Sequence, residues 1–125
     1  MALCSADHVA HLRVVAAIGD RPVGLSGHAW FETFSVLTRL PARQRRSADE
    51  VLDLLKHNFP NSVFVDAVDQ VRFVEELGDL RISGGAIYDG LVGLVARSAA
   101  RPLISRDRRA SATYVSLGIV VEFLD

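Results

Sequence analysis

Short apolar runs alternate along the chain with longer segments in which apolar residues recur every three to four positions. The short runs predict β-strands, and they cover residues 21–26, 61–67, 101–105 and 119–124. The longer segments predict amphipathic helices, and they cover residues 7–18, 28–39, 47–58, 67–77, 86–99 and 108–118. Because strands and helices alternate, the pattern predicts an α/β fold around a central parallel sheet.

Local signals support several of these helices. Ser26 stands where it can cap the helix over 28–39. Ser47 and Glu50 form the S-x-x-E pattern of a capping box. The helix over 67–77 carries apolar residues at helical spacing, namely Val68, Val71, Val74 and Leu77. The helix over 86–99 is apolar on nearly all sides, so we expect it to be central in the fold.

The composition fits a single globular domain over residues 1–125. Half of the residues are hydrophobic, and 14 basic and 15 acidic residues leave a formal net charge of −1, so the overall charge does not indicate nucleic-acid binding. The single cysteine, Cys4, excludes an internal disulfide framework and fits a reducing cytoplasm. The first residues do not have the features of a signal peptide, and no run reaches the roughly 18 apolar residues of a membrane span.

Three acidic residues stand out because each follows a predicted strand. Asp107 comes just after the strand over 101–105, Asp89 lies in the first turn of the helix over 86–99, and Glu32 lies in the helix over 28–39. The carboxyl ends of parallel strands meet at one edge of a sheet, so we expect the three carboxylates there. Converging carboxylates repel one another unless a cation joins them. Hard oxygen ligands favour Mg²⁺ or Mn²⁺, and phosphodiester hydrolysis is the natural chemistry of such a site.

Each acid also has a structural interpretation. An acidic residue in the first turn of a helix, such as Asp89, interacts favourably with the helix dipole without any further role. Asp107 could cap a turn, with the arginines of residues 106–109 as its partners. Glu32 could be an ordinary exposed helix residue or could pair with Arg39.

Three stretches together resemble the PIN-domain proteins, and among them the VapC-type ribonuclease toxins of bacterial type II toxin–antitoxin systems. In chain order they are "HAWFETFSVLTRLP", "ISGGAIYDGLVGLVA" and "PLISRDRRASATYVSLGIVVEFL". The resemblance covers roughly residues 7–124. It implies a three-layer α/β/α sandwich and a cluster of four acids that binds Mg²⁺ or Mn²⁺ and cleaves RNA. By this resemblance Glu32, Asp89 and Asp107 match three of the acids, and Ser105 matches a hydroxyl near the water shell of the metal.

The fourth acid of the family has no match in this chain. The family begins with a strand that ends in an aspartate, whereas this sequence begins "MALCSADHVAHL". Asp7 matches the start of the first helix and not the end of that strand. We therefore expect that the first strand is missing and that Met1 is not the ancestral start. With three carboxylates, we expect reduced metal affinity and weak or absent cleavage.

The arginines beside the acids are candidate contacts for RNA phosphates, which would make binding depend on salt. They are Arg39, Arg106, Arg108 and Arg109. The alternative is that they are solvated loop arginines. The resemblance further implies a cognate VapB-like antitoxin, which lays a helix on an apolar groove near Trp30, Phe31 and Phe34, and a homodimer.

A second hypothesis is a PIN domain without catalysis that only binds an antitoxin or RNA, and the missing acid keeps it open. The pair His8 and His11 has the H-x-x-H spacing of zinc ligands, but no further pair supplies the four ligands of a closed site. Gly90 and Gly93 follow Asp89, and we expect them to leave space near its carboxylate.

Overall fold

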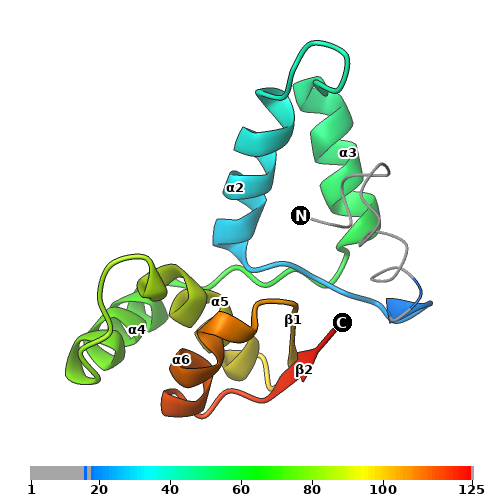
Figure 1. Cartoon of the computed structure of the whole chain (residues 1–125). Helices are drawn as coiled ribbons and strands as arrows, with labels where there is room; N and C mark the ends of the chain where they lie inside the picture. The colour runs from blue at the N-terminus through cyan, green and yellow to red at the C-terminus, as the bar shows by residue number, and fades with distance from the viewer. Residues whose placement is uncertain (1–15, 17, 125) are drawn as a thin grey trace. The chain divides into compact units, whose positions relative to one another are not determined.

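The computed structural model describes residue 16 and residues 18–124 (Figure 1). The chain divides into two compact units, one up to Ser62 and the other from Val63 to Leu124. The predicted helix over 7–18 lies almost entirely outside the described residues, as do Cys4, His8 and His11. In the described part, no helix has the length and apolar character that a membrane crossing requires.

The first unit contains helices α2 (Gly27–Thr38) and α3 (Ala48–Asn58). Both predicted caps are confirmed. The Ser26 side chain accepts a hydrogen bond from the Ala29 N–H at 3.3 Å. Ser47 and Glu50 form both bonds of the capping box, each 3.2 Å long. The helices bury an apolar core made of Leu37, Val51, Leu55 and Phe59.

The strand predicted over 21–26 is wrong, because only Ser26 has a bridge conformation. The backbone of this segment pairs with the chain around Ser62 without forming a ladder. The Asn61 N–H donates to the Val23 carbonyl at 3.3 Å, and the Leu25 N–H donates to the Ser62 hydroxyl at 3.1 Å. The same hydroxyl accepts from the Trp30 indole N–H at 2.7 Å. The Ser62 side chain thus accepts a backbone hydrogen bond that a neighbouring strand would otherwise accept.

The second unit contains α4 (Ala67–Asp79), α5 (Ala86–Ser98), β1 (Leu103–Ser105), the 3₁₀ turn η2 (Arg108–Ala110), α6 (Ser111–Ser116) and β2 (Val121–Phe123). Strands β1 and β2 pair in parallel, with Ser105 opposite Phe123 in the register. The described residues therefore form a mixed α/β fold with a parallel sheet, as predicted.

The strand predicted over 61–67 is also wrong. Only Val63 has a bridge conformation, and the segment leads directly into α4. The Val65 carbonyl accepts from the Gln70 side chain at 2.9 Å, and Asp66 caps α4 by accepting from the Asp69 N–H at 2.8 Å. The Val65 carbonyl, which a strand would direct to a neighbouring strand, is therefore bonded to α4 instead.

The core of the second unit lies around α5, as the apolar character of that helix predicts. Its buried members are Phe73, Leu77, Leu94, Val95, Ala110, Tyr114, Leu117 and Ile119. The glycines of α5 serve this packing. A Cβ at Gly90 would lie 2.7 Å from a Leu77 methyl, and one at Gly93 would lie 2.2 Å from an Ile119 methyl. The expectation that these glycines leave space for the Asp89 carboxylate is therefore wrong, since neighbouring side chains fill that space.

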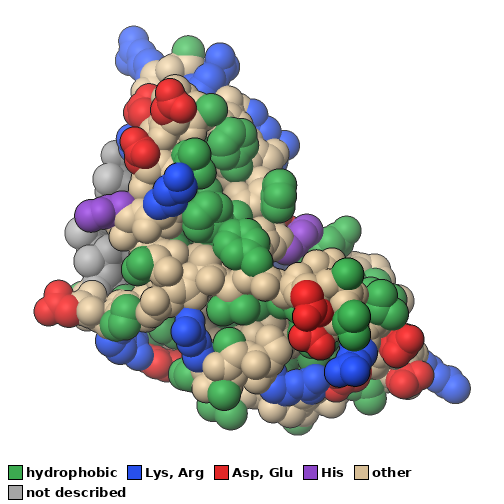
Figure 2. All heavy atoms as spheres, turned by 180° about the vertical axis from the view of Figure 1, so that it is seen from behind, with side chains coloured by type: hydrophobic (Ala, Val, Ile, Leu, Met, Phe, Trp, Pro, Cys, Tyr) green, Lys and Arg blue, Asp and Glu red, His purple; other side chains and the backbone are tan. Residues whose placement is uncertain are grey.

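The apolar face predicted for α4 is only partly buried. Leu77 packs in the core together with Phe73, whereas Val68, Val71 and Val74 are each more than half exposed. Hydrophobic side chains reach the surface of each unit (Figure 2). The helical spacing was correct, but the buried face is centred on Phe73 and Leu77.

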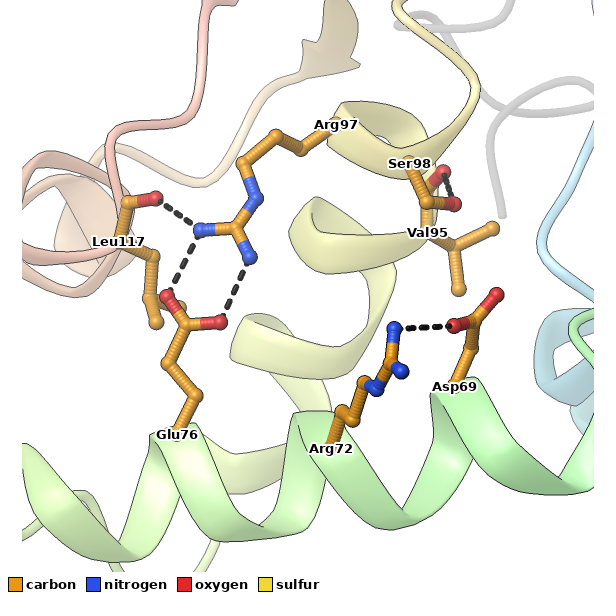
Figure 3. A network of polar contacts seen from close by, with 7 residues as sticks. All are labelled: Asp69, Arg72, Glu76, Val95, Arg97, Ser98 and Leu117. Carbon is orange, nitrogen blue, oxygen red and sulfur yellow. Dashed lines mark hydrogen bonds and ion pairs between the residues drawn. The ribbon is translucent and has the colours of Figure 1, made fainter.

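A partly exposed ion pair connects three helices of the second unit (Figure 3). The guanidinium of Arg97, near the end of α5, donates to both carboxylate oxygens of Glu76 on α4, at 2.8 and 2.6 Å. It also donates to the carbonyl of Leu117, directly after α6, at 2.8 Å. The hydrogen bonds from Arg97 lower the pKa of Glu76, and Glu76 in turn raises the pKa of Arg97.

We expect Glu76→Gln to lower the free energy of unfolding at neutral pH by up to about 1 kcal/mol, because solvent screens a partly exposed pair. Since the folded pKa of Glu76 is lowered, its contribution is fully present above the ordinary pKa of a glutamate. It is lost as the pH falls through the folded value. Urea unfolding should therefore show that the difference from wild type shrinks below about pH 4. Glu75→Gln on the exposed side of α4 is the matched control, and a difference that persists at low pH would contradict this account.

Candidate active site

Asp107 and Ser105 lie together at the carboxyl end of β1. Ser105 is the last residue of the strand, and its hydroxyl accepts a hydrogen bond from the Asp107 N–H at 3.0 Å. The Asp107 carboxylate caps η2 by accepting from the Arg109 N–H at 3.0 Å. The same carboxylate oxygen pairs with the Arg109 guanidinium at 3.1 Å. The turn after β1 therefore holds both side chains in a defined place.

The charge of Asp107 is stabilised by Arg109. The hydrogen bond from the Arg109 side chain is the main cause that lowers the pKa of the Asp107 carboxyl, and the hydrogen bond from the Arg109 backbone adds to it. Asp107 is therefore ionised at neutral pH, as a metal ligand must be. The structural interpretation of Asp107 as a turn cap is also correct, since its side chain makes the capping bond to the Arg109 N–H and pairs with the Arg109 guanidinium.

Asp89 lies in the first turn of α5 and is half-buried. The negative charges of Asp89 and Asp107 both affect the pKa values of Tyr114 and Arg109. Both carboxylates raise the pKa of the Tyr114 phenol, where burial is the largest cause, and both raise the pKa of the Arg109 guanidinium, where Asp107 is the largest cause. The structure thus places Asp89 and Asp107 in one neighbourhood, around Tyr114 and Arg109.

Tyr114 is a residue of this neighbourhood that the sequence reasoning missed. It lies on α6 and is only 5% exposed. Its ring centroid is 6.3 Å from that of Phe123 on β2, and its hydroxyl is 3.5 Å from the Ser105 hydroxyl. A usable signal was present, because Tyr114 is spaced with Ala110 and Leu117 as one helical face, so its ring had to point inward.

Glu32 lies on α2 in the first unit and is exposed. Its carboxylate pairs with His28, one turn earlier on the helix, at 2.8 Å, and not with Arg39. Glu32 was expected at the edge of the sheet because a strand over 21–26 would lead into its helix, and that strand is not present. Its role as a metal ligand stays a prediction from the resemblance.

The donors of the second unit fit a hard divalent cation. Asp89 and Asp107 supply carboxylate oxygens, and Ser105 supplies a hydroxyl. Mg²⁺ is commonly held by one or two carboxylates and keeps several of its waters. In the part of the chain that the structure describes, no three or more His, Cys, Asp or Glu side chains form a group that could hold a metal. A cation held by these two carboxylates and this hydroxyl would keep most of its water shell.

The candidate RNA-binding arginines differ in their surroundings. The Arg108 guanidinium lies over the Phe123 ring, 4.8 Å from its centroid, which fixes the orientation of its side chain. Arg106 is exposed in the turn between β1 and η2, and Arg109 is engaged with Asp107. Arg39 is exposed at the end of α2 in the first unit.

Fold and site together define a mixed α/β protein with an acidic site at the carboxyl end of a parallel strand. No protein-family model matches the chain. The chain is similar to Ribonuclease VapC27 of Mycobacterium tuberculosis, with 39% identity over 114 residues that cover 91% of this chain and 83% of the relative. It is also similar to Ribonuclease VapC40 of the same species, with 37% identity over 121 residues that cover 94% and 87%. The chain belongs to the VapC-type family of PIN-domain proteins.

Proposed function

We propose that the chain is an endoribonuclease toxin that cleaves RNA phosphodiester bonds with the help of Mg²⁺ or Mn²⁺. The observation that carries the proposal is that the charges of Asp89 and Asp107 both act on Arg109 and Tyr114, and that Asp107 lies just after the carboxyl end of β1. The names of the two relatives, both ribonucleases, support the reaction class.

In this proposal Asp89 and Asp107 hold the cation, and Glu32 of α2 stays a further ligand predicted only from the resemblance. The Ser105 hydroxyl, which accepts from the Asp107 N–H, would contact the water shell of a bound cation. The bound cation supplies an activated water and stabilises the leaving oxygen. Arg109 keeps Asp107 ionised, as the lowered pKa of that carboxyl indicates.

The arginines Arg39, Arg106, Arg108 and Arg109 are the proposed contacts for RNA phosphates. Arg108 is the best prepared of them, because the Phe123 ring already holds its guanidinium in place. A guanidinium that is ordered before binding loses less side-chain entropy when it meets a phosphate.

We expect replacement of Arg106 and Arg108 by Ala to flatten the salt dependence of RNA binding. On single-stranded RNA each lost phosphate contact should reduce the slope of log K against log salt by about 0.7. The measurement is a binding titration with the Asp89→Asn variant as background, so that the RNA is not cleaved. Arg72→Ala, which removes an exposed arginine of α4, is the control. An unchanged slope in the double variant would exclude these arginines from the RNA contact.

The partners proposed from the family are a VapB-like antitoxin and a second copy of the chain. Exposed Phe31 and Phe34 on α2 offer an apolar surface for an antitoxin helix. The exposed valines of α4 are a second apolar surface, which fits the proposed homodimer. The RNA substrate and the single cysteine fit a place of action in the cytoplasm.

A PIN domain that binds without cleaving is the second candidate. It is favoured by the ion pair between Asp107 and Arg109, which occupies one oxygen of a proposed ligand. The deciding experiment is an RNA cleavage assay with Mg²⁺, Mn²⁺ or EDTA. The toxin proposal predicts cleavage, weak because three carboxylates are matched, that EDTA abolishes and added metal restores. Binding of RNA without any cleavage would support the second candidate.

A further inference from the structure

Tyr114 spans from α6 to the end of the sheet where the acidic site lies. Its ring packs against Phe123, and Phe123 is the register partner of Ser105. The phenol oxygen lies 3.5 Å from the Ser105 hydroxyl oxygen. The buried Tyr114 side chain therefore places its hydroxyl next to Ser105, the last residue of β1.

The bonds around Ser105 suggest what this polar atom does. A serine hydroxyl has one proton to donate and two lone pairs that accept. One lone pair accepts from the Asp107 N–H at 3.0 Å. The second can accept from the Tyr114 hydroxyl, and then the Ser105 proton must point away from both, toward another acceptor.

The surroundings of Tyr114 favour this direction of donation. Tyr114 lies on the inner face of α6 and is only 5% exposed, so water does not compete freely for its hydroxyl. Among the residues that the structure describes, Ser105 is the hydrogen-bond partner of this phenol. Either hydroxyl can donate in this contact. A buried phenol without an acceptor would be costly, which favours Tyr114 as the donor and Ser105 as the acceptor.

We propose that Tyr114 is a positioning residue of the acidic site, whose hydroxyl orients Ser105 and through Ser105 holds the turn that presents Asp107. This inference rests on the proposed metal site formed by Asp89 and Asp107. Tyr114 touches neither the cation nor the RNA in this account. Its effect reaches the site only through Ser105.

The distance of 3.5 Å is long for two hydroxyl groups, so this contact adds little to the stability of the fold. Tyr114→Phe keeps the ring against Phe123 and removes only the hydroxyl. It therefore separates the positioning role of Tyr114 from its packing role.

The experiment is a calorimetric titration of the purified, EDTA-treated chain with Mn²⁺ alone. Loss of a residue that orients a metal ligand typically weakens metal binding 10- to 100-fold. We expect about 10-fold weaker Mn²⁺ binding in Tyr114→Phe, with an unchanged thermal midpoint. Ser105→Ala should weaken binding at least as much, and the double variant should be no weaker than Ser105→Ala, because both changes break one path. Tyr88→Phe, which removes the hydroxyl of the other tyrosine, is the control.

The outcomes separate this inference from the proposed function. Wild-type affinity in Tyr114→Phe would overturn the inference and leave the metal site standing. Losses from Tyr114→Phe and Ser105→Ala that add in the double variant would also overturn it, since Tyr114 would then act by another path. If the wild-type chain binds no Mn²⁺, the proposed metal site fails, and the inference fails with it.

Discussion

Asp89→Asn should lower the rate of RNA cleavage at saturating Mg²⁺ by at least about 100-fold, since even residues that only orient a ligand change metal affinity or activity by 10- to 100-fold. The substitution keeps the shape and one oxygen donor but removes the negative charge that holds a divalent cation. The measurement is the initial rate of cleavage of an end-labelled single-stranded RNA. Asp89 is half-buried on α5. Like Asp107, it raises the pKa values of Tyr114 and Arg109.

Asp79→Asn is the matched control for this variant. Asp79 is the last residue of α4 and is exposed, so the same chemical change there should leave the rate unchanged. Circular dichroism of both variants checks that the fold is intact. Full cleavage activity in a folded Asp89→Asn variant would exclude Asp89 from the reaction.

Leu94→Ala should lower the free energy of unfolding by about 2–5 kcal/mol, the range measured when a large aliphatic side chain is truncated in a core. Leu94 is 0% exposed and lies on α5 among the buried residues of the second unit. The loss of stability has two parts: the favourable free energy of burying the removed methyl groups, and the cost of the cavity that they leave. Chemical denaturation, followed by circular dichroism, measures the difference.

The control for Leu94→Ala is Leu80→Ala. Leu80 caps the C-terminus of α4 and is 44% exposed, so its truncation should cost less than about 1 kcal/mol. Comparable losses in both variants would contradict the central position of α5. Because α5 carries Asp89, we expect Leu94→Ala also to lower the rate of cleavage. The rate should fall in proportion to the fraction of folded protein.

The features that could be predicted from the sequence depend on few neighbouring residues. The Ser26 cap and the capping box of Ser47 and Glu50 each involve residues within one helical turn, so no distant contact can change them. The strands β1 and β2 were also predicted, and they form within the runs over 101–105 and 119–124. Their apolar runs are bounded by turns and follow strongly marked helices.

The features that were predicted wrongly depend on distant partners. A strand forms only where a neighbouring strand accepts and donates backbone hydrogen bonds. The segment over 21–26 meets the Ser62 hydroxyl, and the segment over 61–67 bonds to the start of α4. The spacing of Val68, Val71 and Val74 correctly indicated a helix, but it could not reveal that another face of α4 would pack on α5.

The candidate site, like the fold, could be predicted only in part from the sequence. Asp107 could be placed because it lies two residues after the end of β1, and Asp89 because α5 is apolar enough to be central. Tyr114 is distant in sequence from Asp89 and was not recognised, since a tyrosine in a helical face looks like an ordinary core residue. Glu32 as a ligand stays a prediction, because it rested on a strand that does not form.

The central claim is that Asp89 and Asp107 form a site for a divalent cation. The most direct test is to record amide NMR spectra of the isotope-labelled chain during addition of substoichiometric Mn²⁺, which broadens the signals of nearby nuclei. The account predicts that the amides around Asp89 and from Ser105 to Arg108 broaden first, and that Asp89→Asn abolishes this selectivity. Broadening that is centred elsewhere, or that is the same in wild type and Asp89→Asn, would contradict it.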